Sequence, residues 1–172
     1  KILNNFIQLI LIVLLISCSK NEKVSIVKEK NIETQMIEAF EEGYSELEDG
    51  DVLFAAKKFN EAELLYPQSE WAPKAALMAA YAYYSQDYYF DAEYELKRFI
   101  KVYPNQKNIS YAHYLLAMVY YERIVDEKKD LEPLILAEEK FKFVVKNYPD
   151  TDFALDSSYK LDLIQDYLAS KE

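Results

Sequence analysis

Three Tyr-Pro pairs divide the chain, and their spacing constrains the fold more than any other feature of the sequence. The pairs are Tyr66-Pro67, Tyr103-Pro104 and Tyr148-Pro149, and their prolines lie 37 and 45 residues apart. Each pair closes an amphipathic run, as in "RFIKVYP". Proline cannot continue a helix, and it drives the residue before it out of the helical conformation. The three pairs therefore predict helix ends that recur with an internal repeat.

The segments that follow the first two of these prolines align without a gap. "PQSEWAPKAALMAAYAYY" ends at Tyr84 and "PNQKNISYAHYLLAMVYY" ends at Tyr121. Ala80 and Ala117 share one repeat position, and a step of 37 residues back from Ala80 reaches Gly43. Because a small residue lets two helices approach closely, we expect the paired helices to touch at these three positions.

The second half of each unit carries an alanine followed by apolar residues four and seven positions later, which is one face of a helix. The three sets are Ala55, Phe59 and Ala62; Ala92, Leu96 and Phe99; and Ala137, Phe141 and Val144. From Ala92 to Ala137 there are 45 residues, but from Ala80 to Ala117 there are 37. The eight additional residues fall within Glu122 to Pro133, and they predict an enlarged turn inside the third unit.

The composition favours an all-helical chain. Only two glycines and five prolines occur in 172 residues, which is few for strands and tight turns. The formal net charge is −10, and residues 1–17 contain one lysine and no acid, which leaves −11 for the remainder. Since a phosphate backbone would be repelled, we expect no nucleic-acid partner.

The N-terminus has the pattern of a bacterial lipoprotein signal. An apolar run from Leu9 to Ile16 is followed by Ser17 and Cys18, the only cysteine. We expect residues 1–17 to be a signal peptide, Cys18 to carry covalent lipid, and residues 18–31 to form a charged tether. A membrane-spanning helix is the alternative, but it needs about 20 apolar residues. We expect no cofactor apart from this lipid.

The repeated pattern of a small residue, a turn, an alanine, large apolar residues and a closing proline resembles the tetratricopeptide repeat family. This resemblance implies an all-α solenoid in which helix pairs stack into a right-handed superhelix. It predicts one domain over residues 32–172. Within this domain the repeats span about 36–69, 73–106 and 110–151, and one further helix spans about 152–170.

The order of the motifs resembles a narrower family, the BamD lipoproteins of the outer-membrane β-barrel assembly machinery. A lipoprotein signal, a tether, "YAYY", "RFIKVYP", "NISYAHYL", a long turn in the third repeat and "YPDTDFALDSSYKLDLIQDYLA" follow in that order. The resemblance implies a non-enzymatic periplasmic subunit on the outer membrane. Its implied partners are a BamA-like barrel-assembly subunit, other assembly lipoproteins and unfolded outer-membrane proteins. Family members carry about five repeats, so this chain departs from the pattern in their number.

The first helices of stacked pairs line a concave surface, where we expect an aromatic groove that holds an extended peptide. Packing between neighbouring helices is the alternative use for each tyrosine. The groove also includes Ile37, Leu47 and Lys74, and its principal predicted positions are Phe40, Tyr44, Leu77, Tyr81, Tyr84, Tyr111, Tyr114, Met118 and Tyr121.

Other candidate residues favour structural roles. His113 is the only histidine, so a histidine-based metal cluster or triad is not available, and we expect it to pack. Arg98 and Arg123 are the only arginines, and we expect intramolecular ion pairs. Ser69 and Thr151 are predicted helix N-caps.

Two questions stay open at this stage. Asp162 stands at the repeat position of Gly43, Ala80 and Ala117, where a buried carboxylate would be costly. The last helix is therefore rotated, solvated as a cap, or without its partner helix.

The alternative function is a repeat-bearing lipoprotein scaffold for pilus or secretin assembly or for cell-wall synthesis, and a carboxylate-based hydrolase is a third hypothesis.

Overall fold

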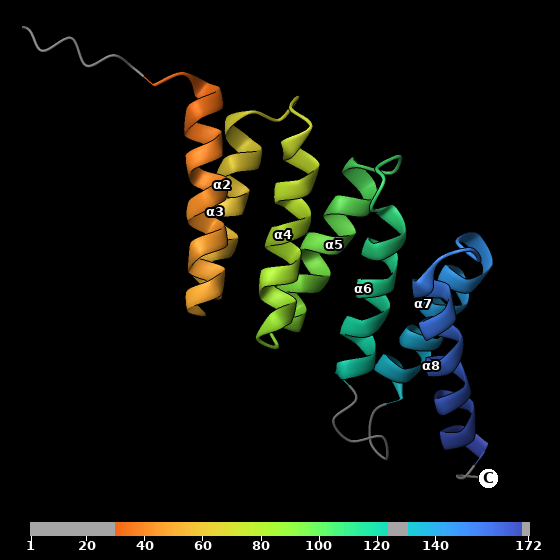
Figure 1. The fold of residues 1–172 in the computed structure, drawn as a ribbon. Coiled ribbons are helices and arrows are strands. Elements are labelled where there is room, and N and C mark those ends of the chain that lie inside the picture. Colours follow the sequence, from red (N-terminus) through yellow and green to blue (C-terminus); the bar gives the residue numbers. More distant parts are fainter. Residues whose placement is uncertain (1–29, 124–130, 170–172) are drawn as a thin grey trace, which may run out of the picture.

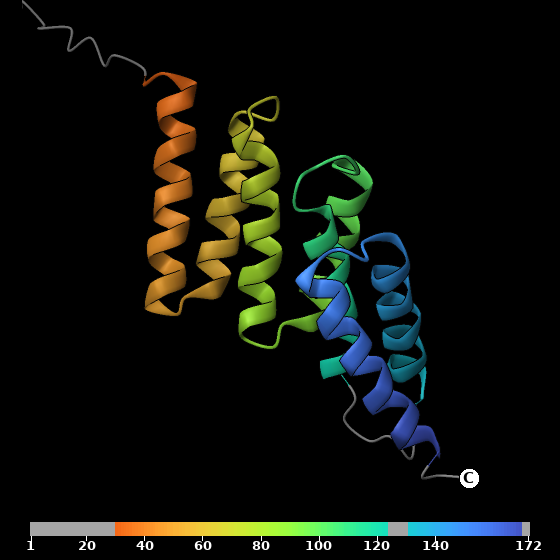
Figure 2. The ribbon, with the colours of Figure 1, turned by 45° about the vertical axis from the view of Figure 1, so that its right-hand side comes forward.

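The computed structural model describes residues 30–123 and 131–169, and within them the chain is helical, with no strand. The helices follow one another in a single row from α2 to α8 (Figures 1 and 2). They are α2 (Ile32–Asp49), α3 (Val52–Leu65), α4 (Trp71–Ser85), α5 (Tyr89–Val102), α6 (Ile109–Glu122), α7 (Glu132–Asn147) and α8 (Asp152–Ala169). This architecture confirms the predicted all-α class and its succession of helix pairs with one further helix.

Each helix packs mainly on its neighbours in the chain, and α6 also contacts α8. Successive helices run in opposite directions, so the turns lie along two opposite edges of the row (Figure 1). The turns within the pairs α2–α3 and α4–α5 lie along one edge, and the turns between pairs lie along the other.

The Tyr-Pro pairs end the second helices as predicted. Tyr66, Tyr103 and Tyr148 are the C-terminal cap residues of α3, α5 and α7. Their φ and ψ angles of −142° and 71°, −122° and 50°, and −132° and 49° lie outside the helical region, because the following proline disfavours that region.

Gly43 lies at a close approach between α2 and α3. A Cβ atom at this position would stand 3.0 Å from Phe59 Cδ1 and 3.2 Å from the carbonyl oxygen of Ala55. The equivalent residues Ala80 and Ala117 are fully buried. The prediction of small residues at helix contacts is confirmed.

The predicted N-cap at Thr151 is confirmed, whereas Ser69 lies one residue before Glu70, the N-cap residue of α4, and still bonds to the first turn. The Ser69 hydroxyl accepts from the backbone N–H of Ala72 at 3.1 Å, and the Thr151 hydroxyl accepts from that of Ala154 at 3.2 Å. Each bond satisfies an N–H group that the first turn of a helix leaves without a partner.

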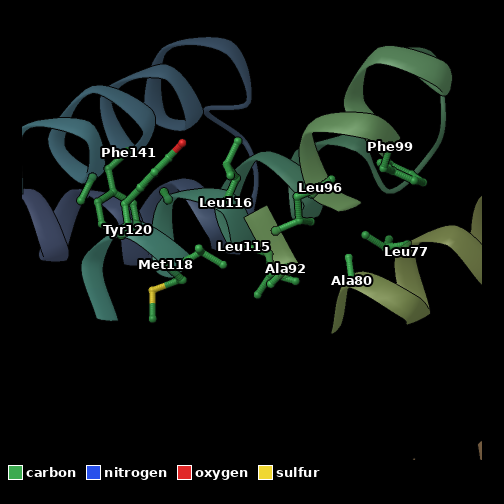
Figure 3. Close-up of a cluster of buried hydrophobic side chains, with 14 of the residues drawn as sticks. Leu77, Ala80, Ala92, Leu96, Phe99, Leu115, Leu116, Met118, Tyr120 and Phe141 are labelled. Carbon is green, nitrogen blue, oxygen red and sulfur yellow. The ribbon is translucent and has the colours of Figure 1, made fainter. Parts of the chain in front are cut away.

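Two hydrophobic clusters form the core. One joins α2, α3 and part of α4 around Met36 and Phe59, and the other extends from α4 to α8. Figure 3 shows the second cluster, in which Leu96 and Phe141 have no exposed surface. Because each cluster draws on consecutive helix pairs, the pairs bury their apolar faces against one another as in a solenoid.

A buried polar network ties α3 to α5. Both terminal nitrogens of Arg98 donate to Glu63, at 2.8 and 2.6 Å, and its Nε donates to Glu95 at 2.8 Å. The hydroxyl of Tyr103 donates to Glu63 at 2.7 Å. Glu63 and Glu95 are buried. Arg98 therefore has the predicted ion pairs, and so does Arg123, which pairs with Glu93 of α5.

Helix α8 presents the same face to the preceding pair as α4 and α6 do, so it is not rotated. Ser157 is fully buried at the repeat position of Ala75 and Ala112, and Asp162 is exposed. The face that carries Asp162 also exposes Leu155 and Tyr159. The Asp162 carboxylate is solvated, so the predicted cost of burying it does not arise.

Several predictions fall outside the described residues. Cys18, the signal segment 1–17 and residues 18–29 of the tether lie there, as do residues 124–130 of the enlarged turn. Within the described part, none of the helices has the length and apolar character needed to cross a membrane.

We expect Gly43→Leu to lower the free energy of unfolding by about 3 kcal/mol, because the new side chain would overlap Phe59 in a packed interface. Urea unfolding followed by circular dichroism measures this loss. Ser45→Leu, on the exposed side of the same helix, is the control and should change stability by less than about 1 kcal/mol. Equal effects of the two variants would contradict the close contact.

We expect Arg98→Met to cost about 3 kcal/mol, because it leaves the Glu63 and Glu95 carboxylates buried without their counter-charge. Lys97→Met removes the neighbouring ion pair with Glu93, in which Lys97 is solvent-exposed, and should cost less than about 1 kcal/mol. Comparable losses measured by chemical denaturation would show that the buried network contributes little.

Candidate peptide-binding surface

The predicted groove residues all lie on α2, α4 and α6, but they differ in exposure. Tyr44 and Tyr81 are exposed, at 49% and 38% of their surface. Four more tyrosines are half-buried, namely Tyr84, Tyr111, Tyr114 and Tyr121. Phe40, Leu77 and Met118 are buried. The groove positions therefore do not form one uniform surface.

Leu77 and Met118 belong to the hydrophobic core, which corrects the expectation that they line the groove. Both are part of the cluster in Figure 3, with 7% and 8% of their surface exposed. Both side chains pack against residues of neighbouring helices in this cluster, and this packing buries them.

A pocket of about 340 Å³ lies between α2 and α4, at the N-terminal end of the row. We call it the aromatic pocket. It is lined by Ile37, Phe40, Glu41, Tyr44, Trp71 and Lys74. Phe40 packs edge-on against Trp71, with ring centroids 5.2 Å apart, and against Phe59 at 5.3 Å. These contacts anchor Phe40 to the core while one side of it remains part of the pocket.

Lys74 brings a positive charge to this apolar pocket. Its Nζ lies 4.5 Å from the centroid of the Trp71 ring and 5.2 Å from that of Phe40. Among the described residues it forms these ring contacts and no ion pair. A cation held over aromatic faces is attracted by their electron density and can still meet an anionic group of a ligand.

Helix α8 covers the tyrosines of α6. The Phe153 ring lies 5.3 Å from the rings of both Tyr111 and Tyr114. The Tyr114 hydroxyl donates to Asp156 Oδ2 at 2.8 Å, and Lys160 Nζ lies 4.8 Å from the Tyr121 ring centroid. The tyrosines of α6 are therefore engaged in packing between helices, which leaves the open part of the surface over α2 and α4.

The pKa values of Tyr111 and Tyr114 agree with their packing between helices. Burial raises the pKa of Tyr111 to about 12, with a smaller effect of the neighbouring Tyr81 and Tyr84. Burial also raises the pKa of Tyr114, and its hydrogen bond to Asp156 adds to the shift. Both hydroxyls stay protonated at neutral pH, and the Tyr114 hydroxyl donates to Asp156.

His113 packs, as predicted. Its ring lies 4.5 Å from the Phe143 ring and 5.7 Å from the Tyr148 ring, measured between centroids. Burial lowers the pKa of His113, and the charge of Lys140 lowers it further. Within residues 30–123 and 131–169, no group of three or more His, Cys, Asp or Glu side chains could hold a metal ion.

Sequence reasoning missed Trp71 and Glu41 as parts of the pocket. Trp71 is the first residue of α4, two residues before the predicted start of the second repeat at 73, so it was not counted among the groove positions. The sequence could have indicated Trp71 as a pocket residue, since it is the only tryptophan of the chain and lies one helical turn before Lys74.

Residues 32–172 match the family model YfiO, described as an outer membrane lipoprotein. The chain is similar to the outer membrane protein assembly factor BamD of Caulobacter vibrioides, at 38% identity over 130 residues, which are 76% of this chain and 43% of that protein. It is similar to BamD of Rickettsia prowazekii at 38% identity, over 69% of this chain and 47% of that protein. The match to BamD of Neisseria gonorrhoeae is 26% identical, over 77% of this chain and 54% of that protein. The matched part of the chain thus spans about half the length of these relatives.

We expect the chain to lose stability as the pH falls below about 6.5, because unfolded His113 binds a proton there and the folded state resists it. An NMR titration of this single histidine should give a pKa below its ordinary value. The melting temperature should fall between about pH 7 and about pH 5.5. His113→Phe, which keeps an aromatic ring, should remove most of this fall. A pKa above the ordinary value would contradict the burial argument.

Proposed function

This chain belongs to the YfiO family of outer membrane lipoproteins, and we propose that it is a non-enzymatic subunit of the machinery that assembles β-barrel proteins in the outer membrane. In this role it receives unfolded outer-membrane proteins and scaffolds their insertion. The printed names of the relatives, outer membrane protein assembly factor, support this role.

The observation that carries the proposal is the aromatic pocket between α2 and α4. It joins the exposed rings of Tyr44 and Trp71 to the charge of Lys74. Concave sites with apolar walls and a few placed polar groups are the usual form of ligand pockets, and rigid aromatic side chains are frequent anchors of bound peptides. Tyr81, exposed further along α4, extends the aromatic surface beyond the pocket.

The chemistry of this pocket suits the end of an unfolded outer-membrane strand. Such strands alternate apolar and polar residues and commonly end in Phe or Trp. In our proposal the terminal aromatic side chain enters the pocket, and the terminal carboxylate pairs with Lys74. The alternating side chains before it lie toward Tyr81.

The subunit works on the periplasmic face of the outer membrane, anchored by lipid on Cys18. It docks on a BamA-like barrel-assembly subunit and on other assembly lipoproteins. No observation favours the alternative scaffold for pilus, secretin or cell-wall assembly, and the similar proteins named above are assembly factors for outer-membrane proteins.

We expect a fluorescein-labelled peptide of alternating Tyr and Ser that ends in Phe to bind the purified chain in fluorescence anisotropy. Trp71→Ala should weaken binding about tenfold, because it removes one wall of the pocket. Lys74→Ala and amidation of the peptide's terminal carboxylate should each weaken binding several-fold, and combining them should add little, because both remove the same ion pair.

Tyr159→Ala changes an exposed tyrosine on α8, remote from the pocket, and is the matched control. If it weakened binding as much as Trp71→Ala does, the pocket would not be the site. In cells, a photo-crosslinking residue at Tyr81 should give adducts with unfolded barrel proteins. Adducts with pilus or cell-wall proteins alone would overturn the proposed function.

A further inference from the structure

Large apolar side chains stand exposed at one repeat position in all three second helices. Leu53, Phe90 and Ile135 lie in the first turn of α3, α5 and α7, with 50%, 73% and 59% of their surface exposed. They are 37 and 45 residues apart, the same spacing as the Tyr-Pro pairs. A single exposed apolar side chain is ordinary. Three at one repeat position form a row across the solenoid.

This row lies along the edge formed by the turns within the helix pairs. A pocket of about 390 Å³ opens there between the α2–α3 turn and the α4–α5 turn. It includes Leu53 and the exposed Tyr88. Helix α2 begins at the opposite edge (Figure 1). The aromatic pocket described above includes none of these residues.

The two described turns of this edge, α2–α3 and α4–α5, carry negative charge. Four exposed aspartates belong to the two turns and to the helix ends beside them, namely Asp49, Asp51, Asp87 and Asp91. None of the four forms an ion pair with another described residue. Arg123 lies 4.2 Å from the Phe90 ring centroid, but its charge is paired with Glu93. We call the three apolar residues and the four aspartates the acidic edge.

We propose that the acidic edge is a docking surface for a basic, apolar segment of another protein. Exposed Leu, Phe and Ile side chains gain free energy when an apolar partner covers them. The aspartates have no ion pair with another described residue, although Asp51 accepts a hydrogen bond from the Phe54 N–H and Asp87 from the Tyr89 hydroxyl. Their charges favour a partner with Lys or Arg beside its apolar residues. The surface thus selects its partner by two requirements that must be met together.

Charge argues against the other occupants. A second copy of this chain would bring the same aspartates against the first, and the formal net charge of −10 adds to that repulsion. An anionic lipid surface would be repelled for the same reason. The proposal does not depend on the peptide-binding role of the aromatic pocket, because the two surfaces share no lining residue.

The test uses three fluorescein-labelled peptides in anisotropy measurements with the purified chain. One peptide contains five repeats of Leu-Arg-Ser, the second has Glu in place of each Arg, and the third has Ser in place of each Leu. We expect the first peptide to bind at least tenfold more tightly than the other two. Raising the salt concentration should weaken its binding, because exposed charges are screened.

Matched variants locate the binding. Phe90→Ser should weaken binding of the Leu-Arg-Ser peptide about tenfold, whereas Leu64→Ser, which changes an equally exposed residue near the other end of α3, should change it less than twofold. The double variant Asp49→Asn with Asp91→Asn should weaken binding several-fold and reduce its salt dependence. Trp71→Ala should leave it unchanged, so this test and the test of the aromatic pocket can fail separately.

Three outcomes would overturn the proposal. The first is equal binding of the Arg and Glu peptides. The second is an equal effect of Phe90→Ser and Leu64→Ser in chains that circular dichroism shows to be folded. The third is self-association in sedimentation experiments that Phe90→Ser abolishes, which would make a second copy the occupant of the edge.

Discussion

The close approach of the two helices in each pair is the constraint on which the rest of the structure depends. At Gly43 a single methyl group would lie 3.0 Å from the Phe59 ring and 3.2 Å from the carbonyl oxygen of Ala55, which is tighter than most contacts of a Cβ atom. Ala80 and Ala117 hold the same position in the next pairs, and the large side chains Phe59, Leu96 and Phe141 are fully buried in the second helices. A small residue facing a large one fixes the separation of each pair, and the fixed separation allows the pairs to stack in register.

Stacking alone would leave neighbouring pairs joined by apolar contact, which is not directional. Hydrogen bonds and ion pairs add direction at the interfaces between neighbouring helix pairs. Arg98 links α5 to Glu63 of the preceding pair, and Tyr114 links α6 to Asp156 of α8. These residues do not recur at the other interfaces, so each interface between helix pairs has its own polar contacts.

The two proposed surfaces arise from different consequences of the same repeat. The aromatic pocket lies between the first helices α2 and α4, where rings from neighbouring pairs meet and Lys74 adds one positive charge. The acidic edge lies where the turns gather, since turns collect polar residues and the start of each second helix exposes one apolar side chain. One surface offers a positive charge and the other a set of negative charges, so they suit partners of opposite charge.

Periodicity in the sequence was sufficient to predict the class of the fold, the ends of α3, α5 and α7, the close contact at Gly43, and the cap at Thr151. These features depend on local backbone chemistry and on spacing, both of which can be read from the chain itself.

Tertiary structure alone decided which aromatic residues are open to a partner. Tyr81 and Met118 stand at one repeat position, yet Tyr81 is exposed and Met118 is buried, because burial depends on which helix lies opposite. Tyr111 and Tyr114 are covered because Phe153 and Asp156 reach them from α8, and Trp71 joins the pocket because α4 brings it against Phe40. Such contacts join residues about 30 to 40 positions apart, and no pattern within a single helix encodes them.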